Sequence, residues 1–242
     1  TLGEASTLLH DEKKILIATT VDLVNAKVPV LMNIAEQSTK AAILAAEAAE
    51  QQGANGLMLL PPMRYAACPE ETLLYISEVV KSTSLPLLIY NNPVDYKIEI
   101  TLKMFDALLK YDNIQAVKES TRDITNVTRI INRFGDRLKI MTGVDTIALE
   151  SLIMGASGWI AGLVCAFPKE TVALYELQKA GRIQEAIDLY RWFMPLLELD
   201  INSKLVQNIK LAEVYTEIGT EFVRPPRLPL FGTERTQVQH II

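Results

Sequence analysis

The chain has 242 residues, of which 49% are hydrophobic and 22% are charged, and this composition is typical of a globular protein. Its 24 basic and 29 acidic residues give a net charge of −5 without a long basic run, which argues against nucleic acid as a partner. No apolar stretch is long enough to span a membrane, and we find no signal peptide and no Cys or His spacing typical of a metal site. We therefore expect a cytoplasmic protein without a metal, with Cys68 and Cys165 reduced.

Six short apolar runs predict strands that helices cover on both faces, at 28–35, 56–62, 85–92, 114–120, 138–144 and 158–163. Helical patterns separate them at 39–52, 69–82, 101–111, 121–134 and 146–154, and several begin with threonine, a favourable helix N-cap. The strand-to-strand spacing of about 20–30 residues indicates βαβ units in a parallel sheet. Because no G-x-G-x-x-G follows any strand, the pattern favours a (β/α)8 TIM barrel over a dinucleotide-binding sheet.

The two ends of the pattern complete the predicted architecture. The opening TLGEAS precedes a helical stretch at 7–25, as the loop after a strand would, so we expect the first two strands of the barrel to be missing from this chain. The alternative is an open six-stranded sheet with an exposed parallel edge. Helical patterns at 168–180, 183–199 and 202–218 precede a proline-rich tail at 224–230. We therefore predict a barrel over 1–167 and a C-terminal helical extension of the same domain over 168–242.

Lys118 lies at the C-terminal end of the run IQAVKES, where TIM-barrel enzymes carry their catalytic groups. Burial disfavours the ammonium form, so a lysine in such a position can act as a nucleophile and form a Schiff base with a ketone. Tyr90 ends the neighbouring predicted strand, and its phenol could relay protons while the carbinolamine forms and collapses. The alternatives are ordinary ones: strand-end lysines are mostly solvated, and a tyrosine can simply cap a core.

Four ordered motifs resemble the dihydrodipicolinate synthase/N-acetylneuraminate lyase family, over essentially the whole chain. They are T-L-G-E at 1–4, Y-N-N-P at 90–93, V-K-E-S at 117–120 and G-V-D at 143–145. The resemblance implies a TIM-barrel lyase, assembled as a homotetramer or homodimer, that forms a lysine Schiff base with a small α-keto or imino acid and uses no cofactor.

The resemblance also implies a role for individual residues. Lys118 would carry the Schiff base, Tyr90 would relay protons, and Thr1 would supply a hydroxyl to that relay. The backbone amides of Thr1 and Leu2 would hold the substrate carboxylate. The substrate pocket would be lined by Gly143, Asp145 and Ile160. Asp145 could equally be a charge at a helix N-terminus.

Departures from the synthase pattern bear on the reaction. The stretch Val94-Asp95-Tyr96 lacks the arginine that synthases of this family carry shortly after Y-N-x-P, and Arg64 stands where they have a tyrosine. The roles of Arg64 and Asp95 stay open at this point. A combination of five motifs resembles the branch linked to hydroxyproline degradation: T-L-G-E, L-P-P-M, Y-N-N-P, A-G-L-V and R-W-F-M-P-L-L. We therefore predict a 1-pyrroline-4-hydroxy-2-carboxylate deaminase, which we expect to release ammonia and carbon dioxide from its cyclic imine acid.

Three alternatives to the deaminase remain. The first is a dihydrodipicolinate synthase-like enzyme, and the second is an aldolase or dehydratase acting on a 2-keto-3-deoxy sugar acid. The third is a non-catalytic member of the family, such as a keto-acid sensor or a scaffold. The presence of both Lys118 and Tyr90 favours an enzyme, because a sensor needs no nucleophile with a proton relay beside it.

Overall fold

The computed structural model describes residues 2–62 and 65–242, so the predictions for Thr1 and Arg64 lie outside the described residues. Contacts group the chain into two compact units. The first unit is Leu8–Ile140, and the second unit joins the residues up to Thr7 with Met141–Ile242. The predicted division at residue 168 stays a prediction. None of the described helices is long and apolar enough to cross a membrane.

Four parallel strands form the sheet of the first unit: β1 (Leu31–Ile34), β2 (Gly56–Leu59), β3 (Leu87–Asn91) and β4 (Ile114–Glu119). Each lies within a predicted apolar run, and each ends earlier than the run does because the last residues turn into the following loop. All four point the same way, so their C-terminal ends meet at one edge.

A bulge sets the pairing of the last two strands. Leu87 pairs with Ile114, but Leu88 pairs with Ala116, so Gln115 is an extra residue on β4. From there the pairing is regular and brings Tyr90 opposite Lys118. An unbroken register from Leu87 would instead have placed Val117 opposite Tyr90.

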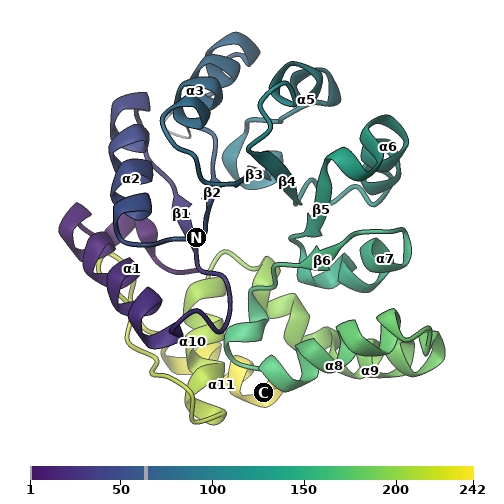
Figure 1. The fold of residues 1–242 in the computed structure, drawn as a ribbon. Coiled ribbons are helices and arrows are strands. Elements are labelled where there is room, and N and C mark those ends of the chain that lie inside the picture. The colour runs from purple at the N-terminus through teal and green to yellow at the C-terminus, as the bar shows by residue number, and fades with distance from the viewer. Residues whose placement is uncertain (1, 63–64) are drawn as a thin grey trace. The chain divides into compact units, whose positions relative to one another are not determined.

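Helices of the first unit are α1 (His10–Val24), α2 (Thr39–Gln51), α3 (Pro69–Lys81), α4 (Pro93–Tyr96), α5 (Leu102–Leu108) and α6 (Thr125–Phe134). Figure 1 shows α2, α3 and α5 side by side along one face of the strands. The buried face of α2 consists of alanines, whose small side chains let the helix approach closely. Thr101 is the N-cap of α5, whereas the cap of α2 is Ser38, one residue before the threonine that begins the predicted helix.

Strand β5 (Lys139–Thr142) begins at the end of the first unit, and its last two residues belong to the second. There it pairs in parallel with β6 (Gly158–Trp159), through Met141–Gly158 and Thr142–Trp159. The helices of the second unit are α7 (Ala148–Ile153), α8 (Pro168–Lys179), α9 (Ile183–Leu197), α10 (Leu205–Tyr215) and α11 (Gly232–Ile241). Helix α11 was not predicted. Its sequence is mostly polar, and Val238 is its one buried residue, so it carries almost no apolar periodicity. The segment 224–230 contains neither helix nor strand, as expected for the proline-rich tail.

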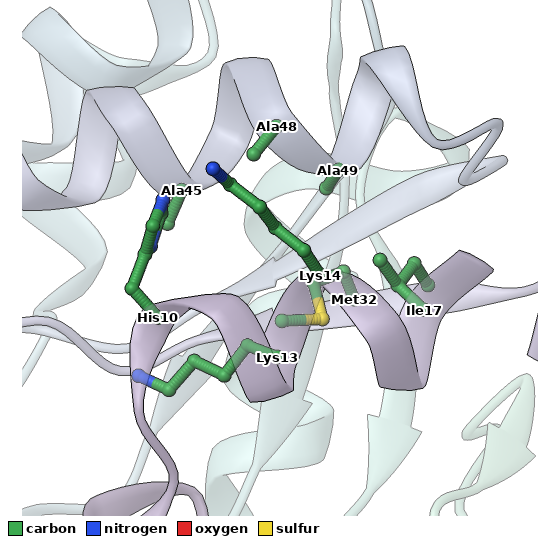
Figure 2. A pocket seen from close by; sticks show the side chains of 8 residues that line it. All are labelled: His10, Lys13, Lys14, Ile17, Met32, Ala45, Ala48 and Ala49. Carbon is green, nitrogen blue, oxygen red and sulfur yellow. The ribbon is translucent and has the colours of Figure 1, made fainter. Parts of the chain in front are cut away.

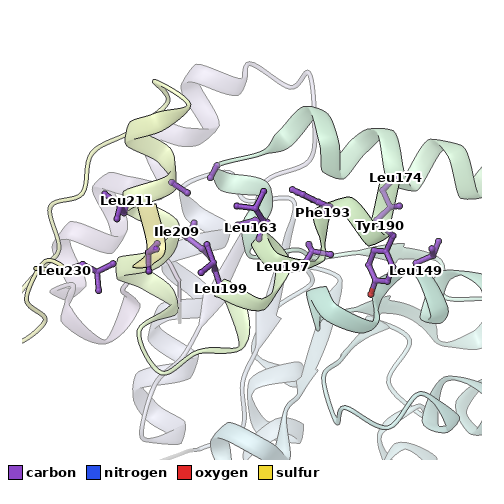
Figure 3. Close-up of a cluster of buried hydrophobic side chains, with 14 of the residues drawn as sticks. Leu149, Leu163, Leu174, Tyr190, Phe193, Leu197, Leu199, Ile209, Leu211 and Leu230 are labelled. Atoms are coloured by element: carbon purple, nitrogen blue, oxygen red, sulfur yellow. The ribbon is translucent and has the colours of Figure 1, made fainter. Parts of the chain in front are cut away.

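A continuous apolar core holds the helices of the second unit together (Figure 3). Phe193 on α9 lies at its centre, fully buried, with its ring edge-on to that of Phe167 at 5.9 Å between centroids. Leu163, Leu197 and Ile209 pack in the same cluster. Parallel strands alternating with helices, followed by a helical C-terminal part, confirm the predicted α/β class.

A buried carboxylate anchors the N-terminal segment of the second unit. Glu4 is only 5% exposed, and its backbone has the left-handed φ of 53°. Its side chain accepts hydrogen bonds from the Arg224 amide and the Lys210 ammonium, both at 2.9 Å, and Arg227 lies 3.8 Å away. One carboxylate therefore ties the residues around Glu4 to α10 and to the proline-rich tail.

This anchor makes stability depend on pH. Burial alone would raise the pKa of Glu4, but the Arg224 amide and the two cations outweigh it and hold the pKa below its ordinary value of 4.5. Such a carboxyl stabilises the fold above its unfolded pKa and loses that contribution as the pH falls through its folded pKa. We expect Glu4→Gln to lower the free energy of unfolding at pH 7 by about 1–3 kcal/mol and to flatten its decline below about pH 5. Denaturant melts at a series of pH values measure both effects.

Glu47→Gln is the matched control, because Glu47 is exposed on α2. It should leave the free energy of unfolding within about 0.5 kcal/mol of the original at every pH. Parallel pH curves for the natural chain and Glu4→Gln would contradict the anchoring role.

Candidate active site

Tyr90 and Lys118 meet at the C-terminal edge of the first unit's sheet. They are register partners on β3 and β4, and the Lys118 Nζ lies 4.4 Å from the centroid of the Tyr90 ring. Tyr90 is buried, because β3 is apolar and covered along its whole length. The structure therefore brings together the two side chains that the sequence singled out as nucleophile and proton relay.

The Tyr90 hydroxyl belongs to a short polar chain. Asn92 Nδ2 lies 3.3 Å from the Tyr90 Oη, and it also donates to Asp95 Oδ2 at 2.8 Å. Asn92 is the N-cap of α4 and accepts from the Asp95 amide, which fixes its orientation. A phenol oxygen can accept one hydrogen bond and donate another, as a group that relays protons must.

Around the pair, the Tyr96 ring packs edge-on against Tyr90 at 5.5 Å between centroids. A lysine amine beside a phenol in such partly apolar surroundings can add to a carbonyl carbon and exchange protons with the hydroxyl. Beyond Lys118, the buried Ser120 Oγ has no hydrogen-bond partner among the described residues.

Arg122 is a charged residue near this edge that the sequence analysis did not identify. Its guanidinium lies 3.8 Å from Asp95 Oδ1, and both side chains are about half exposed. Arg122 lies in the loop after β4, whereas none of the residues 94–96 is an arginine. The signal that could have revealed it is the position of Arg122 four residues past Lys118, since loops after neighbouring parallel strands lie side by side.

The second unit holds most of the other predicted substrate contacts. Asp145 follows β5 and is fully buried, and its carboxylate accepts from Trp159 Nε1, the Gly162 amide and the Leu163 amide at 2.8–3.2 Å. These bonds fix the loop after β6, which contains Ile160. The carboxylate thus bonds to that loop, while the residue itself begins the short 3-10 helix Asp145–Ile147. The pocket-lining roles of Gly143, Asp145 and Ile160 stay predictions.

Leu2 also belongs to the second unit, where its side chain packs against the apolar core. Its side chain is thus used for packing, and only its backbone amide remains for the predicted carboxylate contact. That contact stays a prediction, as does the role of Thr1, which lies outside the described residues.

A small pocket lies elsewhere in the first unit, where α1 crosses β1 and α2 (Figure 2). Its floor is apolar, formed by Ile17, Met32 and alanines of α2, and His10, Lys13 and Lys14 complete its lining. Lys13 is already paired with Glu36. The pocket contains neither Tyr90 nor Lys118, so we assign it no part in the chemistry. No cluster of His, Cys, Asp and Glu among the described residues could hold a metal ion.

Comparison with known proteins gives one consistent result. The chain matches the model of the dihydrodipicolinate synthetase family over residues 1–242. It is 28% identical over 242 residues to a 4-hydroxy-tetrahydrodipicolinate synthase of Geotalea daltonii, covering 98% of this chain and 82% of the relative. It is 31% identical over 196 residues to a protein of the same name from Thermodesulfovibrio yellowstonii, covering 81% of this chain and 67% of the relative.

Solved structures agree with the sequence matches. The 4-hydroxy-tetrahydrodipicolinate synthase from Methylacidiphilum fumariolicum matches with a TM-score of 0.93 at 26% identity, covering 99% of this chain and 80% of that chain. A dihydrodipicolinate synthase from Bacillus anthracis matches with a TM-score of 0.94 at 25% identity, covering 99% and 82%. These matches confirm the predicted barrel class with its C-terminal helical part.

Proposed function

Because the chain belongs to the dihydrodipicolinate synthetase family, we propose that Lys118 is the nucleophile of a lyase that forms a Schiff base with a small α-keto or imino acid. The family is one of lyases that work through a lysine Schiff base, so the chain is an enzyme of that class. The observation that carries the assignment to Lys118 is its position beside the ring of the buried Tyr90, at the C-terminal end of β4.

In the proposed reaction, the Lys118 amine adds to the carbonyl carbon of the keto acid and gives a carbinolamine. The Tyr90 hydroxyl protonates the departing oxygen, which leaves as water, and an imine remains. The imine then accepts the electron pair of a bond broken at a neighbouring carbon. Water finally hydrolyses the product imine and restores the amine.

The remaining roles in this proposal come from the family resemblance. The backbone amides of Thr1 and Leu2 hold the substrate carboxylate, and the Thr1 hydroxyl joins the proton relay. Gly143, Asp145 and Ile160 contribute to the substrate pocket. The bonds from Asp145 to the loop after β6 support a role for this residue in fixing the loop that carries Ile160.

Within the family, the finer proposal is a 1-pyrroline-4-hydroxy-2-carboxylate deaminase. Asp95 stands where a synthase would need a cation, and its carboxylate lies in the polar chain that ends at the Tyr90 hydroxyl. A carboxylate there disfavours a second anionic substrate, although Arg122 offsets part of its charge. A reaction with a single cyclic imine acid as its substrate needs no cation for the carboxylate of a second substrate.

The atoms of this reaction balance without loss of carbon. Lys118 adds to the C=N carbon and opens the ring, which frees the nitrogen as an amine on the terminal carbon. Elimination of the hydroxyl as water and hydrolysis of the resulting terminal imine release ammonia, and hydrolysis of the lysine imine gives 2,5-dioxopentanoate. Substrate and product each contain five carbons, so the expected loss of carbon dioxide is wrong and ammonia alone leaves with the product.

A second candidate has its own support. The relatives described above are 4-hydroxy-tetrahydrodipicolinate synthases by name, at 28% and 31% identity. In that reaction the pyruvate imine of Lys118 would condense with an aldehyde that carries its own charged groups. Arg122 is the cation at this edge that could meet such a substrate.

The first prediction concerns the nucleophile. Sodium borohydride added with pyruvate, or with another candidate keto acid, should reduce one imine per chain, and intact-mass and peptide analysis should place it on Lys118. Lys118→Ala should abolish the adduct. Lys110→Ala is the matched control, because the Lys110 amine also lies over a tyrosine ring, that of Tyr111. It should leave the adduct unchanged, because Lys110 is exposed. An adduct that persists in Lys118→Ala would remove the assignment.

The second prediction concerns Tyr90. Tyr90→Phe keeps the ring beneath the Lys118 amine and removes the hydroxyl, so kcat should fall by roughly 10²–10⁴-fold while the fold is retained. Steady-state kinetics and a thermal melt measure the two effects. Tyr111→Phe, at a half-buried tyrosine outside the reactive pair, serves as the control. If Tyr90→Phe turns over at the original rate, the relay runs through another group.

The third prediction separates the candidate reactions. The protein is assayed side by side for ammonia release from 1-pyrroline-4-hydroxy-2-carboxylate and for condensation of pyruvate with aspartate semialdehyde. We expect the first activity and little of the second. Robust condensation without ammonia release would establish the synthase instead. Cleavage of a 2-keto-3-deoxy sugar acid would point to the aldolase alternative, and an absence of any imine would point to a non-catalytic member.

A further inference from the structure

A second pair of side chains lies back to back with Tyr90 and Lys118. Asn91 and Glu119 are the next residues on β3 and β4 and are also register partners. Successive side chains of a strand point to opposite faces, so this second pair points away from the first. Both residues are buried, Asn91 completely and Glu119 to 5% exposure.

The Glu119 carboxylate is held by donors from three directions. Its Oε2 accepts from Asn91 Nδ2 at 3.3 Å and from Asn126 Nδ2 on α6 at 2.9 Å. Its Oε1 accepts from the Thr121 amide at 2.8 Å. One carboxylate therefore joins the end of β3, the loop after β4 and helix α6.

Asn91 completes the connection with its remaining groups. Its carbonyl accepts from the Ser120 amide at 2.9 Å, which continues the pairing of β3 and β4 past Lys118. Its Oδ1 accepts from the Ile100 amide at 2.9 Å, in the segment before α5. The backbone that carries Tyr90 and the backbone that carries Lys118 are thus tied together one residue beyond the reactive pair.

Burying a carboxylate is costly, and burial raises the pKa of Glu119 even though the surrounding donors oppose the shift. An apolar pair would fill this space between sheet and helices without that cost. What a carboxylate with several fixed donors provides, and an apolar side chain does not, is a defined separation and orientation of the two strand ends.

We propose that Asn91 and Glu119 are positioning residues, which set the distance and orientation between the Tyr90 ring and the Lys118 amine. The catalytic importance of this geometry rests on the proposed function, but the geometry itself can be tested without substrate. Neither residue reaches the reacting atoms, since both side chains face away from the reactive pair.

The chain offers a matched control at the other end of the same strands. Asn113 directly precedes β4, and its Nδ2 donates to the carbonyls of Val80 and Thr83 at 3.0 and 3.2 Å. Asn113→Ala therefore removes a part-buried connection between segments, but far along the strand from Tyr90 and Lys118. It should lower the melting temperature and leave the reactive pair in place.

The test exchanges donor and acceptor between the two strands. In Glu119→Gln, the new side-chain NH2 must face another donor, because all three partners of Glu119 donate. In one orientation it faces the NH2 groups of Asn91 and Asn126, and in the other it faces the Thr121 amide. Asn91→Asp sets a carboxylate against a carboxylate. The double variant restores a donor facing an acceptor across the strands, with the half-buried Asn126 free to turn its amide. Each single variant should therefore be impaired, and the double variant should recover.

The first readout is spectroscopic and needs no substrate. The Tyr90 ring should shift the ε-methylene proton resonances of Lys118 upfield, because the Nζ lies 4.4 Å from the ring centroid. NMR of lysine-labelled protein follows this signal, and Lys118→Arg assigns it. We expect the shift to diminish in both single variants, to return in the double variant and to persist in Asn113→Ala.

The second readout is the rate of borohydride trapping with pyruvate. We expect a fall of about 10- to 100-fold in each single variant, recovery in the double variant and no change in Asn113→Ala. If a single variant does not fold, Asn126→Ala removes one donor from a half-buried position and should give the same change at smaller size.

The outcomes separate the two proposals. An unchanged resonance and rate in folded single variants, or equal losses in Asn113→Ala, would overturn the positioning role. A natural chain that traps no keto acid would refute the proposed function, while the Lys118 resonance would still decide whether Asn91 and Glu119 position the pair.

Discussion

The register between β3 and β4 is the constraint on which the candidate site depends. Without the bulge in β4, Lys118 would turn toward the helices and Val117 would stand opposite Tyr90, because side chains alternate between the two faces of a strand. The bulge at Gln115 sets this register early in the strand. The apolar pairs Leu88–Ala116 and Ile89–Val117 then continue it to the strand ends. The chemistry at one edge of the sheet is thus decided several residues away, where nothing reactive is present.

Two buried glutamates show how the same side chain serves different purposes. Glu4 accepts from the Arg224 amide and from Lys210, with Arg227 nearby, and together these groups outweigh its burial and hold its pKa below the ordinary value. The donors around Glu119 are neutral amides, and they do not outweigh its burial, so its pKa lies above the ordinary value. The first is a charge anchor, and the second is mainly a hydrogen-bond acceptor.

Sequence reasoning identified the six strands of the described residues and the Tyr90–Lys118 pair, because apolar runs and a residue at the end of a run are local features. It did not find the bulge at Gln115, since one inserted residue leaves the apolar pattern of β4 unchanged. It missed α11, whose residues are nearly all polar, and Arg122, whose position matters only beside Asp95. The partners of Glu119 come from three segments, and their convergence follows from tertiary structure alone. The choice between deaminase and synthase depends on whether Asp95 or Arg122 meets the substrate, and neither residue type nor spacing in the sequence decides this.

The anchor at Glu4 has a consequence for how the molecule is made. Its partners Lys210 and Arg224 lie 206 and 220 residues further along the chain, among the most distant contacts in the protein. Contacts of such separation form late, because the loop they close is long. During synthesis, these bonds cannot form before α10 and the proline-rich tail have emerged. Tyr90 and Lys118, by contrast, lie only 28 residues apart on paired strands, so β3 and β4 can pair long before the Glu4 anchor closes. The pH-sensitive anchor of the second unit is therefore a late-forming contact, whereas the candidate pair depends on an early one.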